Sequence, residues 1–271
     1  MSQPPDLGRS RIVDLTLLVA EELPCWWSTH MPYQHKTFNY FADIEDQARP
    51  LLNRTGPYQT RWMLMDEHTG THLDAPAHFL PGPGTGLPHA SAMGEVTVDQ
   101  VPLAQIAGPA VLVDASSGLP DAAPGESPAI TADRLIAHER AHGQFQAGEI
   151  VLLQTQWDQY YAPGPAGSRY VHDALVTRTG PGWPAPDATA MEVLLERGVR
   201  CVGTDGPSMG SSHDGAPVHQ VGLAGGAVFV EALCNLGELP RTGAWFCFAP
   251  LKVARGTGAP GRAFAFVDGA S

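Results

Sequence analysis

Basic residues are scarce in this chain. Its 271 residues include 16 Lys and Arg against 28 Asp and Glu, which gives a formal net charge of −12. A nucleic-acid-binding surface needs a basic patch or stripe, because the phosphate backbone is anionic, and no such stripe occurs along this sequence. We therefore exclude nucleic acid as a partner and expect a small-molecule substrate.

Cysteine and long apolar runs are scarce as well. The four cysteines, Cys25, Cys201, Cys234 and Cys247, form no CxxC pair, which predicts free, reduced thiols. Near the N-terminus the apolar run 15–20 is short and leads directly into two glutamates, so it does not resemble a secretory signal. No segment is long and apolar enough to span a membrane. These absences predict a cytoplasmic protein that does not contact a membrane.

Strands outnumber helices in the expected order of elements. Apolar runs predict strands at residues 12–19, 61–65, 110–114, 150–154, 199–203, 227–231, 244–254 and 262–267, with helices at 131–142 and 184–197. Residues 1–10 are expected to be frayed, and the aromatic-rich stretch 25–60 shows no regular period. We predict a single α/β domain over residues 1–271, built around a mixed sheet or a partly closed barrel with few helices.

The densest group of chemically active side chains lies between residues 68 and 78. It consists of His68, His72, Asp74 and His78, all at even offsets from one another. In an extended chain such a set lies on one face, and Gly70 and Pro76 argue against a helix here. Imidazoles and a carboxylate that converge on one point are typical ligands of a divalent transition metal.

A rigid metal site needs ligands from a second segment. His219 and Glu231 are the candidates, because Glu231 ends an apolar run in which an uncompensated carboxylate is costly to bury. The alternative is that Glu231 only begins a solvated loop. Five other histidines have no such partners in the sequence and are expected at the surface or in loops: His89, His138, His142, His172 and His213.

Other residues are candidates for substrate binding. Asp205 and Ser208 follow a predicted strand, where they either position the substrate or form a simple Asx-type turn. Trp26, Trp27 and Phe38 belong to the aromatic-rich stretch. That stretch either covers a pocket with a flat apolar wall or packs as a long loop.

Residues 68–79 resemble the HxGTHxDxPxHF signature of the metal-dependent cyclase superfamily, which includes bacterial kynurenine formamidases and isatin hydrolases. Residues 203–208 resemble its GxDxPS segment, and residues 219–233 its HxxxLxxGxxxxENL segment, with Ala232 where asparagine is usual. The resemblance implies that His68, His72 and Asp74 bind one metal, that His219 and Glu231 hold a second bridged by Asp74, and that His78 is the general acid/base. It also implies an α/β fold with a barrel-like mixed β-sheet flanked by a few helices, and a homodimer or homotetramer.

A site of this kind predicts hydrolysis. One or two Zn or Mn ions per chain would activate water for attack on a small amide, lactam or ester, and His78 would protonate the leaving group. Two alternatives remain open. The same ion could serve a cyclase, dehydratase or isomerase, or the protein could bind metal without catalysis.

Overall fold

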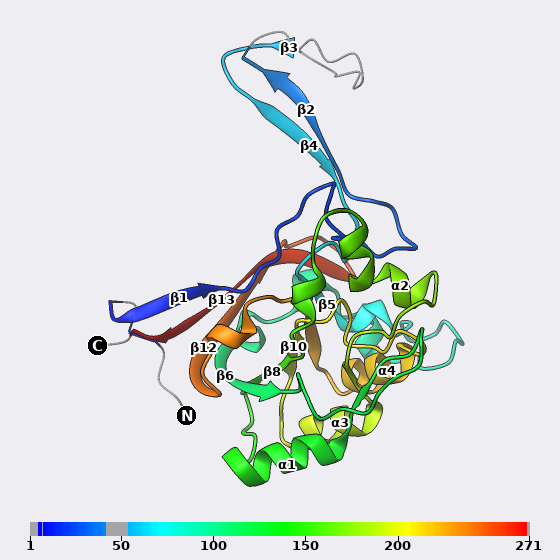
Figure 1. Ribbon diagram of the computed structural model, residues 1–271, viewed down its shortest axis with the longest axis vertical. Helices are drawn as coiled ribbons and strands as arrows, with labels where there is room; N and C mark the ends of the chain where they lie inside the picture. The colour runs from blue at the N-terminus through cyan, green and yellow to red at the C-terminus, as the bar shows by residue number, and fades with distance from the viewer. Residues whose placement is uncertain (1–4, 7, 42–53, 270–271) are drawn as a thin grey trace.

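Seven strands close into a mixed β-barrel in the computed structural model, which describes residues 5–6, 8–41 and 54–269 (Figure 1). Around the ring they are β5 (His72–Asp74), β13 (Gly258–Asp268), β12 (Thr242–Pro250), β6 (Ala107–Asp114), β8 (Ile150–Gln154), β10 (Cys201–Thr204) and β11 (Val228–Glu231). β1 (Ser10–Asp14) pairs with β13 outside the ring. The predicted barrel-like mixed sheet is confirmed.

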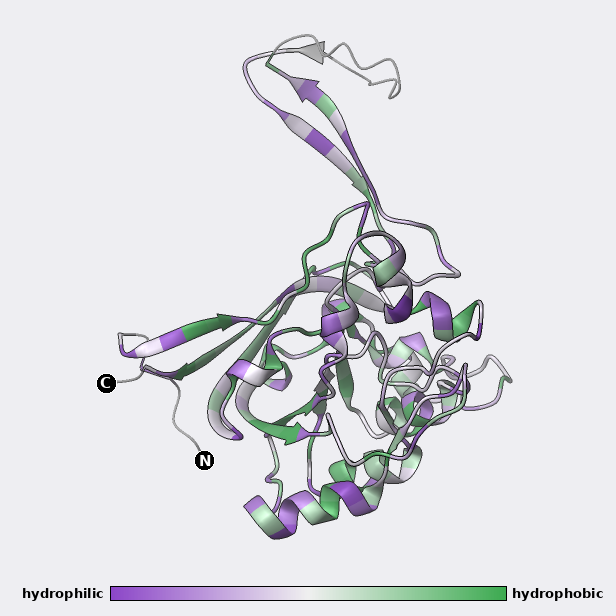
Figure 2. Cartoon of the chain, in the orientation of Figure 1, coloured by the Kyte–Doolittle hydropathy of each residue, from purple (hydrophilic) through white to green (hydrophobic). Residues whose placement is uncertain are grey.

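The parallel strands β6, β8, β10 and β11 are buried on both faces, which explains their nearly continuous apolar sequences (Figure 2). On β8, Ile150 and Leu152 belong to the cluster inside the barrel, whereas Val151 and Leu153 belong to the cluster beneath the outer helices. This alternation follows from the two-residue repeat of a strand. The ring therefore has a filled interior and a second core on its outer face.

Three helices cover that outer core: α1 (Ala132–His142), α3 (Ala188–Glu196) and α4 (Ala216–Ala224). A fourth, short helix is α2 (His172–Leu175). Short 3-10 segments connect the elements: η1 (Pro76–His78), η2 (Ala92–Glu95), η3 (Val98–Gln100), η4 (Leu103–Gln105), η5 (Trp157–Tyr160), η6 (Gly164–Tyr170) and η7 (Leu236–Glu238). In the described ranges, no helix has the length and hydropathy needed to cross a membrane.

Several predicted boundaries were wrong. The second helix begins at Ala188 instead of residue 184, because Asp187 caps it by accepting a hydrogen bond from Ala190 and because β9 (Ala185–Pro186) pairs with β7 (Ala129–Ile130). The first strand ends at Asp14, not at residue 19, and β13 begins at Gly258, where a turn was expected. Gly198 ends the helix region with φ +80°, as predicted.

Part of the stretch 25–60 is regular, contrary to expectation. β2 (Gln34–Tyr40) and β4 (Thr60–Leu64) form an antiparallel hairpin, and β3 (Arg54–Thr55) pairs with β2. This hairpin, which we call the arm, projects from the barrel (Figure 1). Residues 42–53 within that stretch, and residues 1–4 and 7 of the expected frayed end, lie outside the described residues.

Candidate metal centre

The candidate site lies on the outer face of the barrel, where β5 and β11 pair. Glu231 pairs with His72, and Val230 pairs with Leu73. Val230 and Leu73 belong to the interior cluster, so the side chains next to them on each strand point outward, toward α4. His72, Asp74 and Glu231 therefore share one buried surface.

Only part of residues 68–78 is extended, so the predicted reason for their convergence was wrong. β5 covers His72–Asp74, whereas His68 lies in a turn that contains Gly70 at φ +61° and His78 ends η1. The two turns nevertheless bring the outer histidines back to the same carboxylate. His68 Nδ1 lies 2.9 Å from Asp74 Oδ1, and His78 Nε2 lies 3.9 Å from Asp74 Oδ2.

A glycine makes room for His68. Gly258 pairs with Asp74 across the strands, and a Cβ at this glycine would lie 2.6 Å from His68 Cε1. Glu67 fixes the turn to the same strand, because its Oε2 accepts hydrogen bonds from the backbone and hydroxyl of Thr257 and from the backbone of Gly258. The position of His68 is thus set by the start of β13.

The second segment reaches the same point from α4. His219 Nε2 lies 3.3 Å from Glu231 Oε1 and 3.5 Å from Asp74 Oδ2, and His72 Nε2 lies 3.4 Å from Glu231 Oε2. All four side chains are buried. The structure therefore brings together the histidines and carboxylates that the two sequence segments contribute.

Backbone carbonyls orient two of the imidazoles. The Nδ1 of His72 donates to Gly70 O at 2.8 Å, and the Nδ1 of His219 donates to Gly215 O at 2.7 Å. In each ring the Nε2 is left to face the carboxylates. This arrangement is typical of metal-ligating histidines, whose second nitrogen is held by an outer hydrogen bond.

The electrostatics of the site follow from two adjacent buried carboxylates. Burial alone would lower the pKa of His72, but Glu231 and Asp74 outweigh it and raise that pKa to about 9. Burial is outweighed by the same two carboxylates at His219, whose pKa rises to about 10. Burial also opposes the charge on Asp74, yet the neighbouring imidazoles hold its pKa well below the usual value. The carboxylates of Asp74 and Glu231 are therefore stabilised by positive charge nearby, carried by protonated imidazoles or by a cation.

His78 differs from the other two. Burial lowers its pKa to about 4, although Asp74 acts in the opposite direction. Its ring lies 4.0 Å from the ring of His68, with an interplanar angle of 31°. His78 is therefore a neutral imidazole at neutral pH, able to accept a proton.

The donor set fits a divalent cation. Asp74 Oδ2 is buried and has no hydrogen-bond partner among the described residues. Two groups bring one ligand atom from each residue within 4.8 Å of the others: His68, Asp74 and His78, and His72, Asp74 and Glu231. Imidazole and carboxylate ligands together suit Zn or Mn. The first group pairs His68 with His78, whereas the sequence had suggested pairing His68 with His72.

A pocket of about 180 Å³ opens above these residues, and we call it the metal pocket. Trp27, Phe79 and Pro207 form its apolar wall. Phe79 stacks on His219, with ring centroids 4.1 Å apart, and Trp27 meets the buried Trp183 edge-on at 5.7 Å. Phe79 and Pro207 were not predicted as site residues, although each is next to a predicted one in the sequence.

Of the other four residues predicted to bind substrate, only one lines the metal pocket. Ser208 lines the metal pocket, 3.5 Å from Glu231 Oε1. Asp205 is buried outside it and accepts hydrogen bonds from the backbones of Thr155 and Gln156, so it ties β10 to β8. Phe38 lies on the arm and is absent from the pocket lining.

Trp26 lines a neighbouring hollow instead of the metal pocket. Among the other histidines, His138 was wrongly expected at the surface, because it is buried against Phe145. His213 accepts a hydrogen bond from the backbone of Ser127.

Two glycine patterns suggest other chemistry but lack the required context. Residues 206–210 match GxSxG, but Ser208 does not sit on a strand-to-helix turn, and its nearest charged contact is Glu231. Residues 256–261 match GxGxxG, but they lead into the strand β13 and not into a helix. Neither segment supports a serine hydrolase or a dinucleotide site.

Comparison with known proteins agrees with this geometry. The chain is 33% identical to an isatin hydrolase of Roseibium aggregatum over 218 residues, covering 78% of this chain and 76% of the relative. It is 29% identical to a kynurenine formamidase of Salinibacter ruber over 206 residues, covering 74% and 76%. A crystal structure of an isatin hydrolase bound to the product analogue thioisatinate superposes with a TM-score of 0.74 at 26% identity, covering 96% of this chain and 94% of that one. The profile described as putative cyclase matches residues 13–211, and the chain therefore belongs to the cyclase family.

Proposed function

We propose that the protein is a metal-dependent hydrolase of a small aromatic or cyclic amide. The observation that carries the proposal is the buried Asp74 carboxylate, one oxygen of which has no hydrogen-bond partner among the described residues, surrounded by four imidazoles at the floor of a pocket with aromatic walls. A cluster of this composition is costly to bury without a cation.

His68, Asp74 and His78 could hold one divalent ion, Zn or Mn, and His72, Asp74, Glu231 and His219 a second. An ion there would supply Lewis acidity, which activates water and polarises a carbonyl group. The chain supplies the remaining functions. Trp27 and Phe79 offer flat faces that can orient an aromatic ring and exclude water from it.

His78 is suited to proton transfer if it does not coordinate the ion. As a neutral imidazole at the edge of the metal pocket, it can accept the proton of the attacking water and donate it to the leaving nitrogen. Its long distance to Asp74, 3.9 Å, distinguishes it from His68 at 2.9 Å. A site that only bound metal would not need this additional group.

The relatives support the choice of substrate class. One is named an isatin hydrolase and another a kynurenine formamidase, and this chain itself belongs to the cyclase family. We extend to this protein the hydrolysis of a C–N bond in an aromatic amide.

The proposal is tested with metal analysis and a substrate panel. Purified protein should carry stoichiometric Zn or Mn and hydrolyse isatin or a formanilide faster than matched lactones and esters. The double variant His68→Ala, His72→Ala should lose both metal and activity. Full activity in metal-free protein, or no turnover of any amide by metal-loaded protein, would reject the proposal.

A second measurement counts the ions. Titration of metal-free protein should show two binding events, and Glu231→Gln should weaken one of them because the carboxylate shared by His72 and His219 is lost. A single event at saturating metal in the wild type would show that Glu231 orients water or substrate instead.

A further inference from the structure

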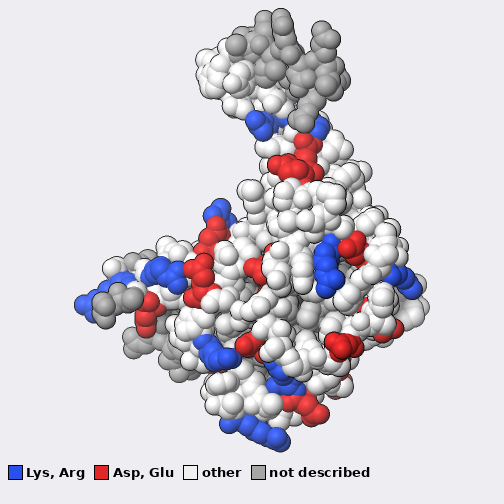
Figure 3. Space-filling view, viewed as in Figure 1, with Lys and Arg blue, Asp and Glu red and all other residues white. Residues whose placement is uncertain are grey.

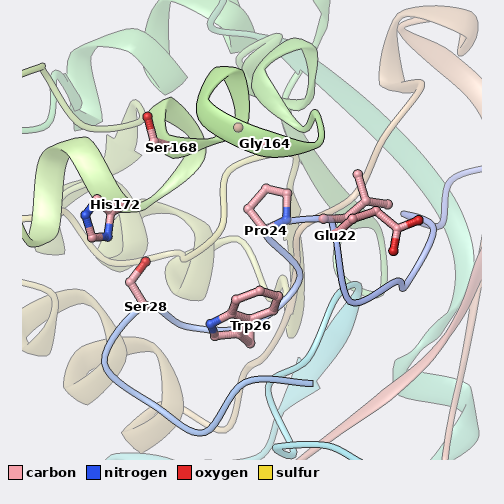
Figure 4. Close-up of a pocket in the computed structure, with 9 residues that line it drawn as sticks. Glu22, Pro24, Trp26, Ser28, Gly164, Ser168 and His172 are labelled. Atoms are coloured by element: carbon pink, nitrogen blue, oxygen red, sulfur yellow. The ribbon is translucent and has the colours of Figure 1, made fainter. Parts of the chain in front are cut away.

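A second hollow adjoins the metal pocket. This outer pocket has a volume of about 300 Å³ and lies between the loop 22–28 and the segment η6 (Figure 4). Its lining includes Glu22, Pro24, Trp26, Ser28, Ser168 and His172. None of these side chains belongs to the metal-ligand groups.

A small hollow of about 20 Å³ lies between the two. It shares Pro24 and Trp26 with the lining of the outer pocket, and Trp27, His68 and His72 with the lining of the metal pocket. Trp27 is anchored edge-on against Trp183, whereas Trp26 has no aromatic ring partner among the described residues. Trp26 therefore lines both the outer pocket and the small hollow beside it without being held by another ring.

One end of the outer pocket gathers hydrogen-bond donors. The indole nitrogen of Trp26, the hydroxyl of Ser28 and the imidazole of His172 lie toward this end, and the carboxylate of Glu22 points away at the opposite end (Figure 4). Within the described part of the chain, none of these three donor side chains has a hydrogen-bond partner. A flat ring with an anionic group fits such a lining, since Trp26 offers an aromatic face and the donors offer partners for a carboxylate.

We propose that the outer pocket is a second binding site, for a small aromatic carboxylate. The ligand class rests on the proposed function. Opening a cyclic aromatic amide breaks its C–N bond, adds the hydroxyl of water to the carbonyl carbon and a proton to the nitrogen, and so leaves a carboxylate and an amine on the same product. The outer pocket is where that product binds after it has left the metal pocket.

Binding of 2-aminobenzoate to the metal-loaded protein tests the proposal. Isothermal titration calorimetry should resolve a binding event that the double variant Ser28→Ala, His172→Ala weakens by about tenfold or more, the usual scale for removing hydrogen bonds to a charged group. Any event at the metal pocket should remain. Aniline, which lacks the carboxylate, should not produce the binding event that the double variant weakens.

His142→Ala is the matched control, because it removes an exposed histidine on α1. If the double variant does not fold, Ser28→Ala alone is measured in the same way. The proposal is overturned if no binding event responds to these changes. Hydrolysis is assayed separately. If the protein cleaves amides but no 2-aminobenzoate binding event responds to the substitutions, only the outer binding site is rejected. If such a binding event is found but no amide is hydrolysed, only the proposed function is rejected.

Discussion

Asp74 is the residue on which the arrangement of the site depends. It sits on β5 between the two groups of possible ligands, and its carboxylate approaches His68, His72, His78 and His219 at 2.9–3.9 Å. Without a cation, protons on His72 and His219 offset its charge and that of Glu231. A bound cation and these protons are therefore alternatives.

That competition gives a prediction about pH. In metal-free protein the pKa values of His72 and His219 are about 9 and about 10, so both rings carry a proton at pH 7. Metal binding at both Nε2 atoms should release about two protons per chain at pH 7, and affinity should rise with pH until about pH 10, the pKa of His219. Above pH 10 the release should approach zero, because the rings are already neutral.

Calorimetry in buffers of different ionisation enthalpy measures this release directly. His219→Gln should reduce it by about one proton, while His142→Ala should leave it unchanged. Metal binding without proton release at pH 7 would contradict the charge balance described for the site.

His78 gives a second prediction at this scale. His78→Ala should lower kcat by at least about two orders of magnitude, the usual scale for removing a general acid/base, and should leave metal content intact. Metal content separates this role from coordination, which the proximity of His78 to His68 and Asp74 also permits. Loss of an ion together with activity would assign His78 as a ligand, and unchanged kcat would exclude both roles.

The types of site residue were predictable from the sequence, but their geometry was not. Three histidines and an aspartate within eleven residues indicated a metal site whatever the backbone did. The assumption of one extended strand failed because Gly70 at φ +61° and the η1 turn after Ala75 redirect the chain. Phe79 was missed because an apolar residue beside a histidine gives no chemical signal.

At the scale of elements, the packing of α4 on β11 places His219. A Cβ at Gly222 would lie 2.4 Å from Cζ of Phe229, so this glycine lets the helix approach the strand closely. Phe229 lies two residues before Glu231 and is fully buried. The distance between His219 and Glu231 is therefore set by a contact outside the site.

Gly222→Ala should consequently lower stability and disturb the site. Alanine improves helix propensity by about 1 kcal/mol, but overpacking a buried ring costs about 1–3 kcal/mol, so the clash should prevail. We expect a lower free energy of unfolding in urea and weaker binding of one metal ion. Ala224→Ser, at an exposed position of the same helix, is the control, and Gly222→Ala combined with Phe229→Leu should restore part of the loss. A variant as stable as the wild type would show that the helix can shift without cost.

Elements with strong apolar runs were predicted well, and those defined by pairing were not. The strand at residues 150–154 was correct to the residue, because both faces of β8 are buried. The sequence of α4 gave no clear helical signal, since Gly222 lowers its helix propensity, and the helix forms because its apolar residues pack on β11. The arm was missed because its strands bury little in the described chain and so lack a one-sided pattern.

At the scale of the whole molecule, the arm exposes apolar side chains that the described part of the chain does not cover. All five residues of β4 are exposed, including Trp62 and Met63, and Phe38 on β2 is 40% exposed. Lys36 pairs with Glu21 at the neck of the arm, where acidic and basic atoms adjoin (Figure 3). A two-stranded hairpin is marginally stable alone, and exposed apolar surface of this kind typically marks an interaction site.

We expect a second copy of the chain to cover the arm. β4 carries Arg61 and no acidic residue, whereas the whole chain has a net charge of −12, so this strand and the body of another copy carry opposite charge. Light scattering after size exclusion should give the mass of a homodimer or homotetramer. Trp62→Ser combined with Met63→Ser should shift that mass toward the monomer. Leu103→Ser removes a still more exposed apolar side chain from η4 and should leave the mass unchanged. A wild type that stays monomeric at high concentration would mean that something other than this chain covers the arm.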